Sequence, residues 1–473
     1  MMRSERVRSR PKVGTGLLLA LPCAVIALSL MVWITAVSRS GFWADDFLWV
    51  THFARSLGDL SDYHFNVGKY IINVFWALGT EAFGDGSVVP FLMLDALVFA
   101  AGVITWLWVG AKKRWDSVDA WWIGGLFIAT AAWFPTVLWA SNITHSGGFL
   151  ALGAGMFAHE RAMSAQDAPG ARRWSVLSGI AWTFAVASNL LYIGLMVIAF
   201  YCAWHQICKF RHLGMTTPAA CVIAGFWSLL LPIIYFVAVG YPGTTASSPY
   251  AKTGLQFVHD DLRFYRMILA PTDLLTGLYA ALLLGGAVVA FAAVRRRDFF
   301  PIAVLGAAGA TALPALVQSQ QRYVNYMAMP LLLVFSALAS GVRPMLVAER
   351  ESKRLKNTVL LAAAVTLLLL FRQGEELRAY FVRTPYGSSL ATFRSEVASL
   401  TPEGGIICAA LDLDAPQEAL FIAEISGENG FRVPPISAGL TYLVSGAKPC
   451  PAGGPATHIT VSQDARGDFV ASG

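Results

Sequence analysis

Charged residues are scarce in this sequence. Of its 473 residues only 14% are Asp, Glu, Lys or Arg, whereas 56% are hydrophobic. Soluble globular proteins carry about 25% charged residues. The shortage therefore excludes an ordinary soluble protein and indicates a polytopic membrane protein. The basic residues stand in short clusters between apolar runs, so the net charge of +6 marks one side of a membrane and does not predict nucleic-acid binding.

The apolar runs predict about eleven membrane-spanning helices. The first run, 16–37, is longer than the roughly 7–15 apolar residues of a signal peptide, so we expect it to be retained. Two runs, 147–160 and 174–188, are short for a hydrocarbon core of ~30 Å and are expected to be tilted or re-entrant. The sequence has no internal repeat, which argues against an inverted-repeat transporter. The other expected spans are 87–110, 120–140, 190–208, 217–239, 271–294, 299–317, 323–341 and 357–371.

The basic clusters alternate between loops. If the N-terminus is cytoplasmic, every loop on that side is rich in Lys and Arg, as the positive-inside rule requires. These loops are 111–119, 159–174, 209–217, 295–299 and 343–356. The sequence therefore predicts a multi-pass protein of the plasma or inner membrane whose first loop, 38–86, faces the non-cytoplasmic side.

The sequence predicts two domains, a transmembrane domain over 1–371 and a small extracytoplasmic α/β domain over 372–473. Residues 390–400 are typical of a helix, and 404–411 and 457–462 are typical of short strands. Only six cysteines are present. Four lie in or near apolar runs, whereas Cys408 and Cys450 lie in the outer domain, where a disulfide is chemically allowed. We expect these two to be bonded.

Two adjacent carboxylates, Asp45 and Asp46, follow the first apolar run. The rest of that loop holds two amphipathic segments, 47–57 and 67–83, which are expected to lie as helices at the membrane interface. One aspartate would suffice to cap the first of these helices. Two adjacent carboxylates repel each other unless a cation or a donor lies between them, which suits a general base or the ligands of a divalent cation such as Mg²⁺ or Mn²⁺. Both explanations stay open from spacing alone.

A second acidic cluster, His259, Asp260 and Asp261, lies in the long outer loop before the span at 271. These side chains offer base or ligand chemistry on the same side of the membrane. Arg263 and Arg266 follow, and they could bind anions or pair with the aspartates. A solvated group of loop charges is the simpler explanation.

A third candidate is Arg322, which lies with Tyr323 in a short outer turn between two apolar spans. The guanidinium group holds phosphate with two parallel hydrogen bonds and stays charged at any relevant pH. The alternative is that Arg322 extends to the lipid headgroups and Tyr323 belongs to the interfacial belt. Weaker candidates are Lys69, His52, His64, Asn142 and His145.

Three short motifs together resemble the GT-C superfamily of membrane glycosyltransferases. "FWADDF" (42–47) is similar to the acidic motif after the first span of those enzymes. "QRYVNYMAMPLLLVFSALAS" (321–340) is similar to their Arg-Tyr turn and the Pro-containing span that follows. "VGKYIINVFWALGTEAFG" (67–84) resembles bacterial relatives of the phage-type O-antigen glucosyltransferases, which often have Gly-Arg where this chain has Gly68-Lys69.

The resemblance implies a hexosyl- or pentosyltransferase. Its donor would be a polyprenyl-phosphate-linked sugar and its acceptor a glycan, lipid or protein on the non-cytoplasmic face, with inversion at the anomeric carbon. Asp45 and Asp46 would be the catalytic pair or metal ligands, and Arg322, Tyr323 and Lys69 would bind the donor phosphate. His259, Asp260, Asp261 and His145 would form an acceptor or second acidic site.

Two other classes of protein stay open. A transporter or flippase of lipid-linked glycans would need ionisable residues inside its spans, and Asp95 is the clear acid within a predicted span. A polysaccharide polymerase or ligase also uses outer loops, and composition does not exclude it.

Overall fold

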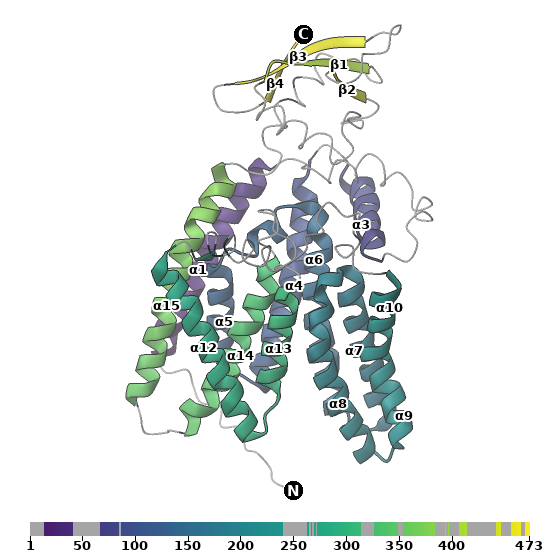
Figure 1. Cartoon of the computed structure of the whole chain (residues 1–473), viewed down its shortest axis with the longest axis vertical. Coiled ribbons are helices and arrows are strands. Elements are labelled where there is room, and N and C mark those ends of the chain that lie inside the picture. The colour runs from purple at the N-terminus through teal and green to yellow at the C-terminus, as the bar shows by residue number, and fades with distance from the viewer. Residues whose placement is uncertain are drawn as a thin grey trace.

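A computed structural model shows a helical bundle with a small β-sheet beyond one end (Figure 1). The structure describes residues 14–40, 67–84, 87–239, 263, 266, 269–270, 272–313, 326–348, 353–383, 393, 396, 406–413, 441–445, 456–464 and 469–473. All eleven expected spans coincide at least in part with described helices. This agreement follows from the physics of lipid, where a spanning segment must satisfy its backbone hydrogen bonds internally.

The first helix is α1 (Gly14–Arg39), and α3 (Val67–Phe83) has the bounds expected for the second amphipathic segment. The bundle continues with α4 (Val89–Lys113), α5 (Ser117–Ala129), the 3₁₀ turns η3 (Phe134–Thr136) and η4 (Ala140–Asn142), α6 (Ile143–Ser164), α7 (Ala168–Ser188), the 3₁₀ helix η5 (Leu190–Leu195) and α8 (Met196–His212). A continuous helical segment follows, which consists of α9 (Thr217–Cys221), the π-helix η6 (Val222–Leu230) and α10 (Leu231–Val239). The remaining helices are α12 (Asp273–Arg296), α13 (Phe300–Ala312), α14 (Ala328–Ala348) and α15 (Lys353–Arg383).

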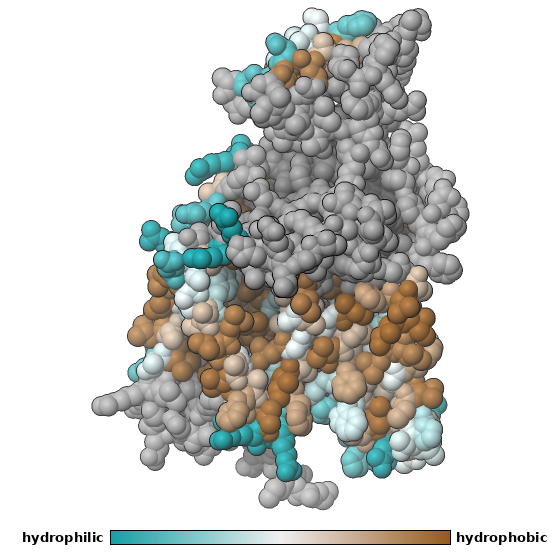
Figure 2. All heavy atoms as spheres, in the orientation of Figure 1, coloured by the Kyte–Doolittle hydropathy of each residue, from teal (hydrophilic) through white to brown (hydrophobic). Residues whose placement is uncertain are grey.

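Six of the described helical segments are long and apolar enough to cross a membrane. They are Leu19–Arg39, Val89–Lys113, Leu191–His212, Thr217–Ala238, Asp273–Arg296 and Asn357–Ala379. Hydrophobic side chains cover the surface of the bundle and hydrophilic ones gather at its lower edge (Figure 2). The chain is therefore a polytopic α-helical membrane protein. Six spans are supported in this way, and the number eleven stays a prediction.

One expected span is interrupted. The run 120–140 begins as α5 but ends its helix at Ala129, and Ala131 has a positive φ of 55°. The chain then makes the 3₁₀ turns η3 and η4, which are buried. Pro135 follows closely, and proline lacks the N–H that a continuing helix would need. Residues 130–140 are therefore apolar because they form buried turns, and they do not continue the helix.

Helices α4 and α6 approach each other through glycine. A Cβ on Gly102 would overlap the backbone of Phe149 and Leu150, and a Cβ on Gly153 would overlap the carbonyl of Gly102. Small residues at such crossings allow the close backbone packing on which membrane helices depend, because lipid supplies no hydrophobic drive between them. This contact fixes the start of α6, which carries His145.

Tryptophan–serine hydrogen bonds join α4 to α14. Trp106 Nε1 donates to Ser336 Oγ at 2.9 Å, and Trp115 Nε1 donates to Ser340 Oγ at 2.6 Å. Both serines are buried and in turn donate to carbonyls one helical turn earlier. The indoles thus use their only donor inside the bundle, so these tryptophans pack in the core and do not serve as interfacial residues.

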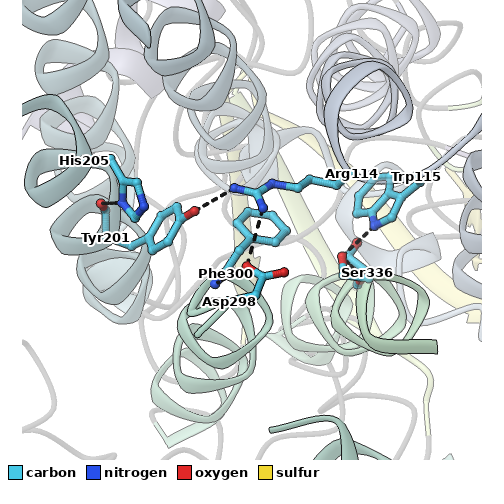
Figure 3. A network of polar contacts seen from close by, with 8 residues as sticks. Arg114, Trp115, Tyr201, His205, Asp298, Phe300 and Ser336 are labelled. Atoms are coloured by element: carbon cyan, nitrogen blue, oxygen red, sulfur yellow. Dashed lines mark hydrogen bonds and ion pairs between the residues drawn. The ribbon is translucent and has the colours of Figure 1, made fainter. Parts of the chain in front are cut away.

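The helix ends that carry Lys112, Arg161, Arg211 and Arg295 form what we call the basic end of the bundle. Here Arg114 links three helices (Figure 3). Its Nη2 donates to Tyr201 Oη at 2.7 Å, its Nη1 lies 3.4 Å from Asp298 Oδ1, and its guanidinium lies over the Phe300 ring at 4.6 Å. The cavity beside this network is only about 10 Å³, which has room for at most a single water. The network therefore fastens α4, α8 and α13 together.

The sheet lies beyond the opposite end, which we call the sheet end (Figure 1). Its strands are β1 (Ile406–Leu411), β2 (Thr441–Ser445), β3 (Ala456–Gln463) and β4 (Phe469–Ser472), in the order β2-β1-β3-β4. The pairs β1–β2 and β1–β3 are parallel, and β3–β4 is antiparallel. Both expected strands are confirmed as β1 and β3. The described residues 393 and 396 of the expected helix 390–400 are helical.

Helix α15 passes the expected domain boundary at residue 371 and ends at Arg383. The reason lies in Arg378, which is 2% exposed. Its Nη1 donates to the Ala129 carbonyl at 3.3 Å, its Nη2 donates to the Phe371 carbonyl, and its guanidinium lies over the Phe371 ring. Two polar residues after 371, Gln373 and Arg378, are thus still buried in the bundle.

Candidate functional site

Most of the predicted site residues lie outside the part of the chain that the structure describes. This holds for Asp45, Asp46, His259, Asp260, Asp261, Arg322 and Tyr323. Lys69 lies in the first turn of α3, and its side chain is likewise outside the described part. The arrangement of these residues must therefore be argued from the described residues that flank them.

The flanking residues gather at the sheet end of the bundle. Ser40 closes α1 before the segment with the acidic pair, and Val67 opens α3 after it. Leu313 and Tyr326 flank the segment that carries Arg322. Figure 1 shows the C-terminal end of α1, helix α3, the C-terminal end of α13 and the N-terminal end of α14 on the side of the bundle toward the sheet. The described residues on either side of the acidic pair and of the arginine thus lie at one end of the bundle.

Arg39 anchors the point where the first of these segments leaves α1. Its Nη1 donates to the Val382 carbonyl at 2.7 Å and thereby joins the last turns of α1 and α15. Trp33 Nε1 donates to the Val137 carbonyl at 3.2 Å and joins α1 to the turn after η3. These bonds hold the end of α1 against the bundle six residues before Asp45.

A buried polar cluster lies at the same end. Its members are Asp95 from α4, His145 from the first turn of α6, and Asn189 and Tyr192 from the junction of α7 and η5. Asp95 is 0% exposed, and its carboxylate acts electrostatically on the Tyr192 hydroxyl. The ring of Tyr326, two residues before the start of α14, lies 5.3 Å from the His145 ring between centroids.

The hydrogen bonds of the cluster determine which nitrogen of His145 carries the proton. Asn189 Oδ1 accepts from the Leu191 N–H at 3.0 Å, so its Nδ2 faces His145 Nε2, 3.1 Å away. An amide nitrogen only donates, and Nε2 must therefore be unprotonated. Nδ1 then carries the proton and donates to Tyr192 Oη at 3.0 Å. The Tyr192 hydroxyl donates onward to the His145 carbonyl at 3.3 Å.

His145 is thus a neutral imidazole with both nitrogens engaged, and it is 6% exposed. The sequence places it among the candidates for an acceptor site, and that assignment stays a prediction; in the structure its two nitrogens bind Tyr192 and Asn189. Asn142, another weak candidate, uses its Nδ2 to donate to the Pro135 carbonyl at 2.9 Å and so stabilises the turn before α6. Both residues thus form hydrogen bonds inside the bundle at its sheet end.

Sequence reasoning did not single out Asn189, Tyr192 or Tyr326. A signal exists for Asn189, because asparagine inside an apolar run favours a cap, and here its side chain accepts from the residue two positions on. No local pattern identifies Tyr192 or Tyr326. Their relation to His145 arises only when α6, η5 and α14 are packed together.

The second acidic region is described only at its arginines. Arg263 and Arg266 are exposed, and Arg266 Nη2 lies 3.2 Å from Asp273 Oδ1 at the start of α12. The Asp273 side chain is 98% exposed, so this pair contributes little to stability. Arg266 therefore has a carboxylate partner outside the predicted cluster.

Among the described residues no group of three His, Cys, Asp or Glu side chains is placed to hold a metal ion. The predicted metal ligands Asp45 and Asp46 are outside that set. As hard oxygen donors they would fit Mg²⁺ or Mn²⁺.

A groove of about 610 Å³ lies between α5, α12, α14 and α15. Its described lining is apolar except for Asp116, Asp119 and Thr366. The two aspartates cap the start of α5 and are close to the basic end. Two carboxylates would repel a phosphate there, so this groove is a poor place for the phosphate of a donor.

Comparison with known proteins gives few matches. No family model matches the chain, and no curated protein does. The chain is similar to the crystal structure of ArnT from Cupriavidus metallidurans bound to undecaprenyl phosphate, at 16% identity and a TM-score of 0.48, over 84% of this chain and 83% of that one. The apo structure of the same protein gives 15% identity and a TM-score of 0.45 over the same shares.

Proposed function

We propose that this protein is an integral-membrane glycosyltransferase that moves a sugar from a polyprenyl-phosphate donor to an acceptor on the non-cytoplasmic face. The observation that carries the proposal is the common location of the flanking residues. The described residues that flank the segment with the acidic pair, and those that flank the segment with Arg322, lie at the sheet end of the bundle. A carboxylate base and a phosphate-binding cation are the two groups that this transfer requires.

The sheet end is the non-cytoplasmic side in this proposal. The opposite end carries clusters such as Lys112-Lys113 and Arg295-Arg296, and basic residues concentrate on the cytoplasmic side of membrane proteins. The sheet, which contains the disulfide-bonded Cys408, then lies in a compartment where disulfides persist.

In the proposed reaction, Asp45 is the general base. It accepts the proton of the acceptor hydroxyl while that oxygen attacks the anomeric carbon from the face opposite the phosphate. The C–O bond to the polyprenyl phosphate breaks, the phosphate leaves with the electron pair, and the anomeric carbon is inverted. Arg322 offsets the charge that develops on the leaving phosphate, with Tyr323 and Lys69 beside it.

Asp46 supports the base either directly or by sharing a divalent cation with it. Such an ion would lower the pKa of a bound hydroxyl and neutralise part of the phosphate charge. His259, Asp260 and Asp261 are assigned to the acceptor side of the site. The ring of His145, which Asn189 and Tyr192 orient, lies against the ring of Tyr326 just before the start of α14.

The first test is binding of a polyprenyl phosphate. Purified full-length protein in detergent is mixed with undecaprenyl phosphate, and bound lipid is counted by native mass spectrometry. We expect binding that weakens strongly in Arg322→Gln and is unchanged in Arg263→Gln, which removes an exposed arginine outside the proposed phosphate site. Equal binding by both variants would remove the assignment of Arg322.

A flippase of lipid-linked glycans is the second candidate, because Asp95 is an acid buried inside a candidate span. It predicts movement of the labelled lipid between leaflets of protein-containing vesicles and loss of that movement in Asp95→Asn. The transferase predicts a new glycosidic product and no dependence of leaflet exchange on the protein.

A further inference from the structure

A groove lies between the ends of α4 and α6 at the basic end, far from the proposed transfer site. Its volume is about 180 Å³. Helices α4 and α6 pack backbone to backbone through Gly102 and Gly153, about two to three turns from this groove. The groove is lined by Trp108, Val109, Lys112, Lys113, Phe157, Glu160, Arg161 and Ser164.

Three cations and one carboxylate line this groove, and the carboxylate is already paired. Lys113 Nζ lies 3.5 Å from Glu160 Oε2 and donates to Ser164 Oγ at 3.3 Å, which closes the groove on one side. Lys112 and Arg161 form no ion pair with any carboxylate in the described part of the chain. The groove therefore presents an excess of positive charge.

Each of these two cations lies against an aromatic ring. Lys112 Nζ lies 3.8 Å from the centroid of the Trp108 ring, and the Arg161 guanidinium lies 5.2 Å from that of Phe157. The two rings are themselves 5.9 Å apart between centroids. Trp108 is 42% exposed on an apolar helix face, a typical place for an interfacial tryptophan. The groove thus combines apolar aromatic side chains with a cationic rim.

We propose that this groove binds the phosphate headgroup of an anionic glycerophospholipid of the cytoplasmic leaflet. The phosphate would lie between Lys112 and Arg161, and the acyl chains would run along Trp108 and Phe157. Basic pockets between membrane helices on the cytoplasmic side suit such headgroups. A zwitterionic lipid would bind more weakly, because its own cationic group would lie near Lys112 and Arg161. The site tightens the α4–α6 pair at the end away from the polar cluster.

The test uses the full-length protein in detergent micelles, with dioleoylphosphatidylglycerol and dioleoylphosphatidylcholine as probes. Lipid retained by the protein is counted by native mass spectrometry. The variant is Lys112→Gln with Arg161→Gln, which leaves the Lys113–Glu160 pair intact. Its matched control is Arg295→Gln with Arg296→Gln, which removes the same charge from exposed positions at the same end of the bundle.

We expect the wild type to retain phosphatidylglycerol in preference to phosphatidylcholine. The Lys112/Arg161 variant should lose roughly twentyfold in affinity for phosphatidylglycerol, since each basic side chain near an anionic surface favours it several-fold. The Arg295/Arg296 control should stay near the wild type. Melting temperatures without lipid, measured for all three proteins, show whether the variants are folded.

Three results would overturn the proposal. Equal losses of phosphatidylglycerol affinity in the variant and the control would mean that the lipid is attracted to the basic end in general and not bound at this groove. Equal retention of the two lipids would remove the headgroup preference. Stabilisation by inorganic phosphate that depends on Lys112 and Arg161, without preferential retention of phosphatidylglycerol, would mean that the groove takes a soluble phosphate. None of these results depends on glycosyl transfer.

Discussion

The imidazole of His145 lies against the ring of Tyr326, with 5.3 Å between the centroids and an interplanar angle of 32°. His145 is in the first turn of α6, and Tyr326 lies four residues after Arg322 and two before the start of α14. The histidine cannot turn away, because Asn189 and Tyr192 bind both of its nitrogens. The buried cluster therefore fixes one anchor of the segment that carries the proposed phosphate ligand.

The hydrogen bonds of this cluster predict the effect of Tyr192→Phe. The change removes the acceptor for the His145 Nδ1–H at a buried site, and an unpaired buried donor costs about 1–3 kcal/mol. We expect a drop of that size in the free energy of unfolding, measured in detergent. Thr35→Val is the control, because its exposed hydroxyl donates only to the Met31 carbonyl and its loss should cost less than about 0.5 kcal/mol. Similar losses in the two variants would contradict the arrangement.

Glycine 148 gives a second test of the same packing. A Cβ at Gly148 would overlap the ring of Tyr192, whereas a Cβ at Gly309 in α13 meets no atom within 4 Å. We expect Gly148→Ala to lower the melting temperature clearly. Gly309→Ala should leave it unchanged or raise it, since alanine favours a helix by up to about 1 kcal/mol over glycine. A tolerated Gly148→Ala would mean that Tyr192 can move aside.

For the acidic pair, we expect Asp45→Asn to abolish transfer from a polyprenyl-phosphate donor, and Asp46→Asn to do the same. Both variants should insert and purify as the wild type does. Asp273→Asn is the control, because it removes an exposed carboxylate at the same end of the bundle. Product formation is followed with labelled donor in proteoliposomes. Turnover near that of the wild type in either variant would exclude that residue as the base.

The guanidinium of Arg322 should be required for its geometry as well as its charge. A lysine supplies a point charge and cannot reproduce two parallel hydrogen bonds to phosphate, so Arg322→Lys should fail to restore transfer. Arg263→Lys should be neutral. If lysine serves at position 322 as well as arginine does, the side chain reaches the lipid headgroups and does not bind the donor.

The cysteines predict a simple count of thiols. Cys408 is 3% exposed and disulfide-bonded, whereas Cys23, Cys202, Cys208 and Cys221 are free. Its expected partner, Cys450, lies outside the described residues. Denatured, unreduced protein should therefore react with alkylating reagent at those free cysteines only, and peptide mapping should recover a Cys408–Cys450 link. Loss of the link should cost roughly 3–4 kcal/mol in the chain-entropy model for a loop of about forty residues. A reactive Cys450 would refute the pairing.

Where helices form was largely predictable from the sequence. The amphipathic segment 67–83 coincides with α3 residue for residue. Strands β1 and β3 coincide with the two apolar and β-branched stretches that were predicted as strands. These agreements have a local cause, because the hydrophobic period and the need to satisfy backbone groups in lipid act over a few turns of chain. For the candidate site, the residue types and the side of the membrane stay predictions from the sequence.

What the sequence by itself determined is thus the class of protein, its helical segments and the chemistry offered by Asp45, Asp46 and Arg322. Only the tertiary structure decided that Arg378 extends α15 past residue 371, because its carbonyl partner at Ala129 is 249 positions away. It also decided the tautomer of His145, whose partners lie 44 and 47 residues along the chain. A hydrogen bond depends on distance in space. Local sequence patterns therefore do not predict which residues, far apart in the chain, become hydrogen-bond partners.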